Sequence, residues 1–91
     1  MQRITQRDLE GLCDRLNKLT GSPETEWTRT NNTTTANIGN YHIDYSVGGV
    51  CLYRMENTGG AVSCPLVDYH TPKKELYNRI QAYIYGIIES K

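Results

Sequence analysis

The chain has no excess of charge of either sign. Its 91 residues include ten Lys and Arg and ten Asp and Glu, so the formal net charge at neutral pH is zero. Non-specific binding of nucleic acid needs a strong positive field, and mimicry of the DNA backbone needs a strong negative one. The balance argues against both of these functions and leaves room only for a local basic patch.

Long apolar runs and paired cysteines are also missing. No apolar stretch approaches the roughly 20 residues of a membrane-spanning helix, and Met1 is followed by Gln and Arg rather than by the apolar core of a signal peptide. The three cysteines, Cys13, Cys51 and Cys64, are odd in number and lack C-x-x-C spacing. We therefore expect reduced thiols and a cytoplasmic location, in the protein's own cell or in a host.

The length predicts a single domain over residues 1–91. A chain of this size buries roughly 60–65% of its unfolded surface, which leaves little stability to maintain preformed catalytic machinery. A binding surface makes smaller demands on such a core than an enclosed active site does.

Two segments carry the signals of an amphipathic helix. In the first, Thr5 is the expected N-cap, Asp8 completes a capping box, and Gly21 is placed to end the helix. In the second, Thr71 is the expected N-cap and Pro72 the first helical residue. Apolar residues recur at helical spacing in both: Leu9, Leu12, Cys13, Leu16 and Leu19 in the first, and Leu76, Tyr77, Ile80, Tyr83, Ile84 and Ile87 in the second.

Residues 25–67, between the helices, are rich in strand signals. We expect strands at TEWTRT, TTTANIGNYHIDYS, VCLYRME and AVSCPLV, with turns at Asn31-Asn32, Gly48-Gly49 and residues 57–60. Gly39 indicates a bulge or a close backbone approach, and Pro65 confines the last strand to an edge or a strand end. The predicted fold is α+β with the order αββββα: a four-stranded antiparallel meander on which an N-terminal and a C-terminal helix pack.

Chemically versatile side chains gather near the middle of the chain. In YHIDYSV, Tyr41, Ile43, Tyr45 and Val47 alternate with His42, Asp44 and Ser46, which predicts one buried and one exposed strand face. His42 and Asp44 could be two members of a nucleophilic triad, but no G-x-S-x-G elbow or cysteine-hydrolase motif supplies the nucleophile. We interpret them as a surface pair and expect no enzymatic activity.

Metal and phosphate sites lack their sequence signatures as well. A zinc site could be drawn from His42, Cys51, Cys64 and His70, but structural zinc sites usually contain ligand pairs two to five residues apart, and these four are isolated. The pairs Gly48-Gly49 and Gly59-Gly60 lie in turns rather than in phosphate-binding loops. We expect no cofactor and no metal.

Several basic and amide side chains are candidates for contact with a partner. Lys73 and Lys74 lie at the expected start of the second helix, where positive charge opposes the helix dipole, so a partner could retain them there. They could equally be solvated lysines beside Glu75. The full set of expected partner-binding residues is Arg29, Asn31, Asn32, Arg54, Lys73 and Lys74.

Three blocks of the chain are distinctive together: ITQRDLEGLCDRLNKLTGSPE, ANIGNYHIDYSVGGVCLYRM and TPKKELYNRIQAYIYGI. They combine a leading helix that ends in LTGSPE, a G-x-Y-x-[IL]-D strand followed by a Gly-rich turn, and a closing helix of the form K-[KR]-[ED]-L-Y-x-R-I. In this pattern the chain resembles, over nearly its whole length, a family of small phage and prophage proteins. No catalytic motif accompanies the resemblance.

The resemblance implies a phage accessory protein that acts in the cytoplasm of an infected bacterium. Small non-enzymatic phage proteins commonly occlude a host assembly, and anti-CRISPR proteins that act on type I-F surveillance complexes include chains of this size. It therefore implies an inhibitor that contacts Cas subunits, guide RNA or both and blocks pairing with target DNA. The alternative is a small phage nucleic-acid-binding or regulatory protein, which would need a basic face.

Overall fold

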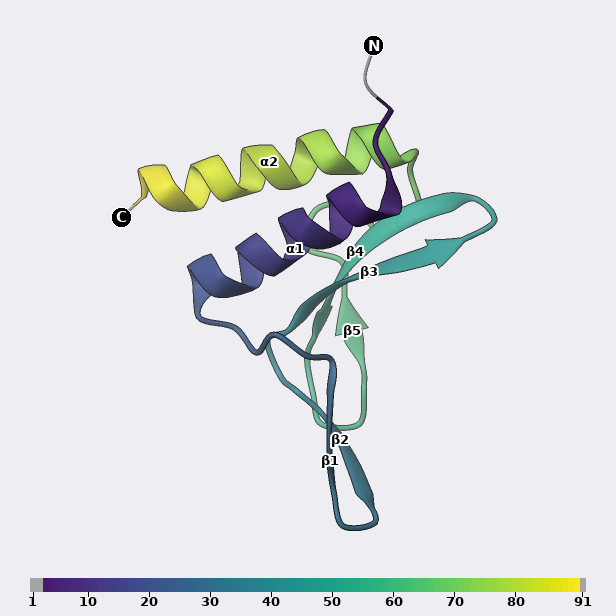
Figure 1. Cartoon of the computed structure of the whole chain (residues 1–91), viewed down its shortest axis with the longest axis vertical. Coiled ribbons are helices and arrows are strands. Elements are labelled where there is room, and N and C mark those ends of the chain that lie inside the picture. Colours follow the sequence, from purple (N-terminus) through teal and green to yellow (C-terminus); the bar gives the residue numbers. More distant parts are fainter. Residues whose placement is uncertain (1–2, 91) are drawn as a thin grey trace.

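The computed structural model describes residues 3–90, which form two helices and five short strands (Figure 1). In chain order the elements are α1 (Gln6–Thr20), β1 (Trp27–Thr30), β2 (Thr33–Ala36), β3 (Tyr41–Ser46), β4 (Gly49–Met55), β5 (Val62–Ser63) and α2 (Lys73–Glu89). The α+β class predicted from the sequence is confirmed. Neither helix in this part of the chain is long and apolar enough to cross a bilayer.

Helix α1 begins and ends at the residues that the sequence indicates. The Thr5 hydroxyl accepts a hydrogen bond from the Asp8 amide, and the Asp8 carboxylate accepts one from the Thr5 amide. Gly21 ends the helix in the left-handed conformation, with φ at 69°. Both caps depend on residues that are close in the sequence, which is why the sequence alone locates them.

Helix α2 begins one residue later than expected, because Thr71 has a different partner. Pro72 is the N-cap, and no side chain caps the first turn. Thr71 instead forms a β-bridge with Val50, in which each backbone amide donates to the carbonyl of the other residue, at 2.8 and 2.9 Å. This bridge attaches the start of α2 to the edge of β4.

The strands form two sheets rather than the single four-stranded meander predicted above. One is the hairpin β1–β2, and the other is a three-stranded antiparallel sheet of order β3-β4-β5. The expected long strand is interrupted by a turn at residues 37–40, where Gly39 has φ of 92° and the Asn40 amide bonds to the Asn37 carbonyl. The Asn40 side chain donates to the Pro23 carbonyl and holds this turn in place. The chain therefore leaves one sheet before it enters the other.

Both helices lie side by side on one face of the three-stranded sheet and run in the same direction (Figure 1). They enclose the core together with the inward side chains of β3 and β4; its buried members are Leu9, Leu12, Cys13, Leu16, Tyr41, Ile43, Val50, Leu52, Leu76, Ile80 and Ile84. Tyr41 and Ile43 are buried, as the alternation predicts. Tyr45 and Val47 do not follow the alternation. Tyr45 is 39% exposed, because its hydroxyl reaches out to donate to Glu10, and Val47 is fully exposed, because β3 ends at Ser46 and Val47 lies in the turn before β4.

The hairpin β1–β2 projects from this body as an arm, here defined as residues 27–36 (Figure 1). All four residues of β1 are exposed, and in β2 only Ala36, at the base, is buried. The other strands belong to the body. The shape is correspondingly elongated, with extents of 47, 37 and 22 Å.

Candidate functional site: the arm and the groove at its base

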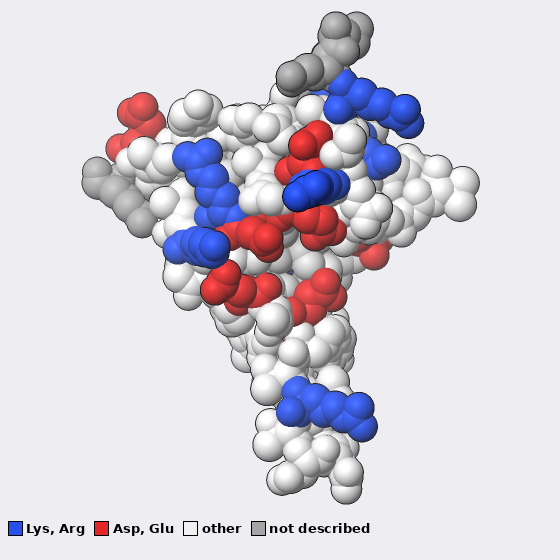
Figure 2. Space-filling model, in the orientation of Figure 1, with Lys and Arg blue, Asp and Glu red and all other residues white. Residues whose placement is uncertain are grey.

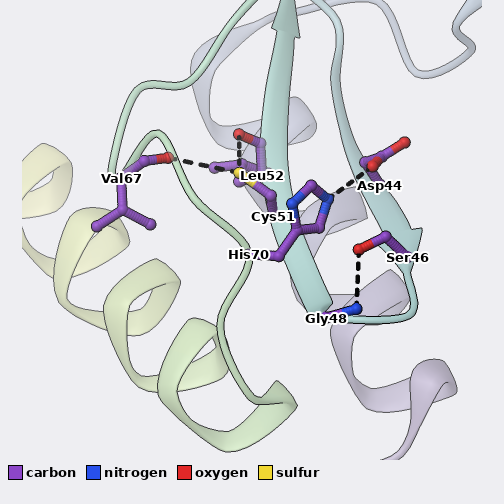
Figure 3. Close-up of polar contacts among 7 residues, drawn as sticks. All are labelled: Asp44, Ser46, Gly48, Cys51, Leu52, Val67 and His70. Atoms are coloured by element: carbon purple, nitrogen blue, oxygen red, sulfur yellow. Dashed lines mark hydrogen bonds and ion pairs between the residues drawn. The ribbon is translucent and has the colours of Figure 1, made fainter.

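The polar cluster in the middle of the chain is assembled differently from the pair that the sequence indicates. Asp44 accepts a hydrogen bond from Nε2 of His70, at 2.8 Å (Figure 3). His42 is 3.2 Å from the amide oxygen of Asn40. The ring of Tyr53 stands edge-on between the two imidazoles, with centroid distances of 5.8 and 6.3 Å. His42 and Asp44 share a strand face as expected, but Asp44 takes its partner from the loop before α2.

This cluster lacks an activated nucleophile. Cys51 is 1% exposed, and its thiol donates to the Val67 carbonyl at 3.4 Å (Figure 3). Burial, and then the neighbouring Cys64, raise the pKa of Cys51 to about 11, so the thiol stays protonated at neutral pH. The Ser46 hydroxyl accepts a hydrogen bond from the Gly48 amide in the β3–β4 turn. These contacts connect the loop to the open face of the sheet and give the cluster a structural role.

The four residues considered for zinc are not arranged as a metal centre. Within residues 3–90, no group of three or more His, Cys, Asp or Glu side chains is placed to hold a metal ion. His70 is instead paired with Asp44, and Cys51 with backbone carbonyls.

The arm presents three of the six side chains expected to contact a partner. Arg29 lies on β1, and Asn31 and Asn32 form the turn at the tip. Asn31 has φ of 55°, a left-handed conformation that Asn tolerates better than most residues and that a two-residue hairpin turn requires. All three side chains are exposed. The structure therefore brings together the part of the predicted set that is contiguous in sequence.

The other three predicted residues lie apart from the arm. Arg54 is on β4, where its guanidinium donates to Glu56 at 2.7 Å and lies over the ring of Tyr41. The bond to Glu56 is the main cause that raises the pKa of Arg54. Lys73 and Lys74 are exposed in the first turn of α2, which is at the opposite end of the molecule from the tip (Figure 1). The six residues do not form one surface.

The base of the arm is fixed to the body by specific contacts. The Trp27 ring packs so closely on Gly60 that a Cβ atom at Gly60 would be 2.6 Å from the indole. The Ala36 amide donates to the Thr58 carbonyl at 3.0 Å. In addition, the Asn37 side chain accepts from Thr28 and donates to the Thr25 carbonyl. An isolated two-stranded hairpin is only marginally stable in water, so these contacts are what give the arm a defined direction.

A groove of about 380 Å³ lies between α1 and the segment that leads into β1. It is lined by Glu10 and Asp14 from α1, by Glu24 and Glu26 from the connecting segment, and by Trp27 at the base of the arm. Figure 2 shows acidic side chains across this region of the body, with basic side chains beside them, and one basic side chain on the arm. Lys18 lies 4.0 Å from Glu24 and offsets part of this charge, but the other three carboxylates have no ion pair within residues 3–90 and leave a local negative potential that the zero net charge conceals.

Sequence reasoning did not identify this groove. Glu26 lies in the strand signal TEWTRT and Glu24 directly precedes it, and neither position indicates that these carboxylates face α1. A weak signal was available, since Glu10 and Asp14 are four residues apart and share one helix face. Only the path of the chain after α1 places the two acidic pairs together.

Comparison of the chain with models of protein families, with curated proteins and with solved structures found no match.

Proposed function

We propose that this chain is a non-enzymatic binding protein that uses its arm to engage a larger partner. The observation that carries the proposal is the arm itself, a rigidly based hairpin that projects from the body and contributes only Ala36 to the buried interior. A strand pair that contributes so little to the core adds little to stability, so stability does not explain its presence. Loops and hairpin tips on a folded scaffold are common binding elements.

The resemblance to phage proteins supplies the identity of the partner in this proposal. The protein acts as a phage-encoded inhibitor of a host defence complex, specifically as an anti-CRISPR protein that blocks recognition of target DNA by a type I-F surveillance complex. The tip offers the amide groups of Asn31 and Asn32 and the charge of Arg29, which can hydrogen-bond to Cas subunits or to exposed guide RNA. Occlusion by a projecting hairpin requires no catalytic group.

The distribution of charge favours contact with protein over contact with bare nucleic acid. The acidic groove lies at the base of the arm. The basic residues are divided between opposite ends of the molecule, with Arg29 on the arm and Lys73 and Lys74 at the start of α2. A phage nucleic-acid-binding protein would present these side chains on one face.

The test is recovery of the surveillance complex on the tagged protein from bacteria that express it, with protein and RNA identified in the eluate. We expect the Cas subunits to be recovered by the wild type and by the variant Lys73→Ala/Lys74→Ala. The variant Asn31→Ala/Asn32→Ala should lose them while remaining folded. Recovery of an unrelated host protein, or equal recovery by both variants, would contradict the proposal. Salt-sensitive recovery of DNA alone would favour the nucleic-acid-binding alternative.

A further inference from the structure

The outer edge of β1 has unpaired backbone groups. In an antiparallel hairpin, successive residues alternately point their amide and carbonyl towards the partner strand and away from it. The Asn37 amide bonds to the Glu26 carbonyl, so Glu26 points inward and Trp27 and Arg29, which follow in alternation, point outward. The Ala36 amide, opposite Trp27, accordingly points outward and bonds to Thr58. No hydrogen bond within residues 3–90 uses the outward groups of Trp27 or Arg29.

This edge also lacks the features that normally prevent strand addition. Edge strands are commonly protected by lysine, proline, a bulge or a covering segment. The sequence of β1 is WTRT, with no lysine and no proline, and its register with β2 is regular. All four residues are exposed. The edge of β2 differs, because Thr58 covers its base.

The acidic groove lies at the base of the same edge, and Trp27 is common to both. Arg29 is the only charged residue of the arm, and the arm has no carboxylate of its own. One molecule therefore carries an unpaired edge with a projecting cation, and beside it a groove with four carboxylates and an indole. The two features are complementary, and no ion pair within residues 3–90 joins them in one molecule.

We propose that two copies of this chain associate through antiparallel pairing of their β1 strands. In this arrangement Thr28 lies opposite Thr28 of the second copy, on the two-fold axis. Trp27 and Arg29 of one copy exchange backbone hydrogen bonds with Arg29 and Trp27 of the other. Each arginine is then held over an indole and next to the acidic groove, which satisfies its charge by cation–π and carboxylate contacts.

The register of the two paired β1 strands is determined by which backbone groups point outward and by the charge of Arg29. A shift by one residue would oppose outward groups to inward ones and lose the backbone bonds. A two-fold axis at Arg29 would place two like charges directly opposite each other, which is destabilising. The axis at Thr28 avoids both problems. Because each copy supplies both an Arg29 and a groove, the contact is self-complementary and closes as a dimer. This inference does not depend on the proposed function.

The first test is sedimentation velocity of the purified protein from about 10 µM to about 1 mM, because an interface of two short strands is expected to be weak. We expect a reversible monomer–dimer equilibrium. Arg29→Pro removes an outward amide and the charge, and should raise the dissociation constant at least about tenfold. Thr34→Pro is the matched control: Thr34 lies opposite Arg29 and its amide faces the other edge, so this variant should dimerise like the wild type.

The second test addresses the register, in a Cys64→Ser background that removes the more accessible native thiol. Thr28→Cys should form a disulfide-linked dimer on mild oxidation, because cross-strand partners at this position have Cα atoms about 4.5 Å apart. Thr30→Cys should not, since its copies would be separated by about four residues along the strands. A monomeric wild type at every concentration, equal loss of the dimer in both proline variants, or equal cross-linking at both positions would overturn the proposal. Circular dichroism checks that each variant folds.

Discussion

The body and the arm are stabilised in different ways. In the body, two helices and a three-stranded sheet enclose eleven buried core residues. The arm has one buried residue, and its position depends on a few contacts at the base, chiefly Trp27 on Gly60 and Ala36 on Thr58. The buried contacts that stabilise the fold are therefore concentrated in the body, and the arm consists mainly of exposed residues. We therefore expect the body to stay folded when the arm's contacts are lost, and the arm to lose its defined direction without the body.

The largest effect is expected from a cavity in the body. Leu16 is completely buried, and Leu16→Ala should lower the free energy of unfolding by about 2–5 kcal/mol, because it removes apolar contacts and leaves a void. Urea denaturation measures this. Val47→Ala is the control, since Val47 is fully exposed in the β3–β4 turn and its truncation should change stability by less than about 0.5 kcal/mol. Equal losses would contradict the role of Leu16 in the core.

A smaller effect is expected from a buried polar contact inside the body. Both polar atoms of the Asn17 side chain bond to the backbone of Tyr41, at 2.8 and 2.9 Å. Asn17→Ala should cost about 2 kcal/mol, because the Tyr41 amide is left buried without a partner. The measurement is again urea denaturation, with Asn78→Ala, at an exposed position of α2, as the control. A loss no larger than that of the control would contradict the assignment.

We expect that the base of the arm can be disrupted while the body stays folded. Gly60 has φ of 99°, and a Cβ atom there would collide with the Trp27 ring. Gly60→Ala should displace the indole and lower stability by about 1–3 kcal/mol. Trp27 is the single tryptophan of the chain, so its fluorescence reports on the base of the arm. The emission should move to longer wavelength while the helical circular dichroism persists. Gly11→Ala, with open space around its Cβ, should leave the fluorescence unchanged. Concerted loss of both signals would mean that arm and body are not separable.

The smallest effect is expected from acid. Glu56 accepts hydrogen bonds from Ser63 and Arg54, and these lower its pKa from the ordinary value of 4.5. A carboxylate with a lowered pKa in the folded state stabilises the protein above the unfolded pKa, and this contribution is lost as the pH falls below 4.5 and through the lower pKa of the folded state. Ser63→Ala removes the hydrogen bond that lowers the pKa of Glu56 most. The melting temperature of this variant should therefore fall less on acidification than that of the wild type. Ser90→Ala, in which a hydroxyl bonded to the Ile87 carbonyl is lost, should leave that dependence unchanged.

Local interactions account for what could be predicted from the sequence. The capping box at Thr5 and Asp8 and the left-handed Gly21 were found because each depends on residues within one helical turn. The burial of Tyr41 and Ile43 followed from strand alternation. The start of α2 was wrong by one residue because Thr71 pairs with Val50, which is distant in sequence and which no local signal reveals.

The candidate site could be predicted only in part, for the same reason. Arg29, Asn31 and Asn32 share one turn, so their proximity followed from the sequence. The acidic groove required α1 and the segment before β1 to meet, and the pairing of Asp44 with His70 joins residues 26 positions apart. The other three expected residues lie away from this turn, because Arg54 is on the sheet and Lys73 and Lys74 are at the start of α2.

The sequence by itself determined the two amphipathic helices, their apolar faces, the β-rich middle and the turn at Asn31 and Asn32, because hydrogen bonds and sterics within a few residues define these features. Only the tertiary structure decided that the strands separate into two sheets and that a hairpin leaves the body as an arm. The turn that divides the sheets is held by the bond from Asn40 to Pro23, and the arm is directed by the packing of Trp27 on Gly60. Both contacts join residues far apart in the chain, so they exist only when the whole body is folded.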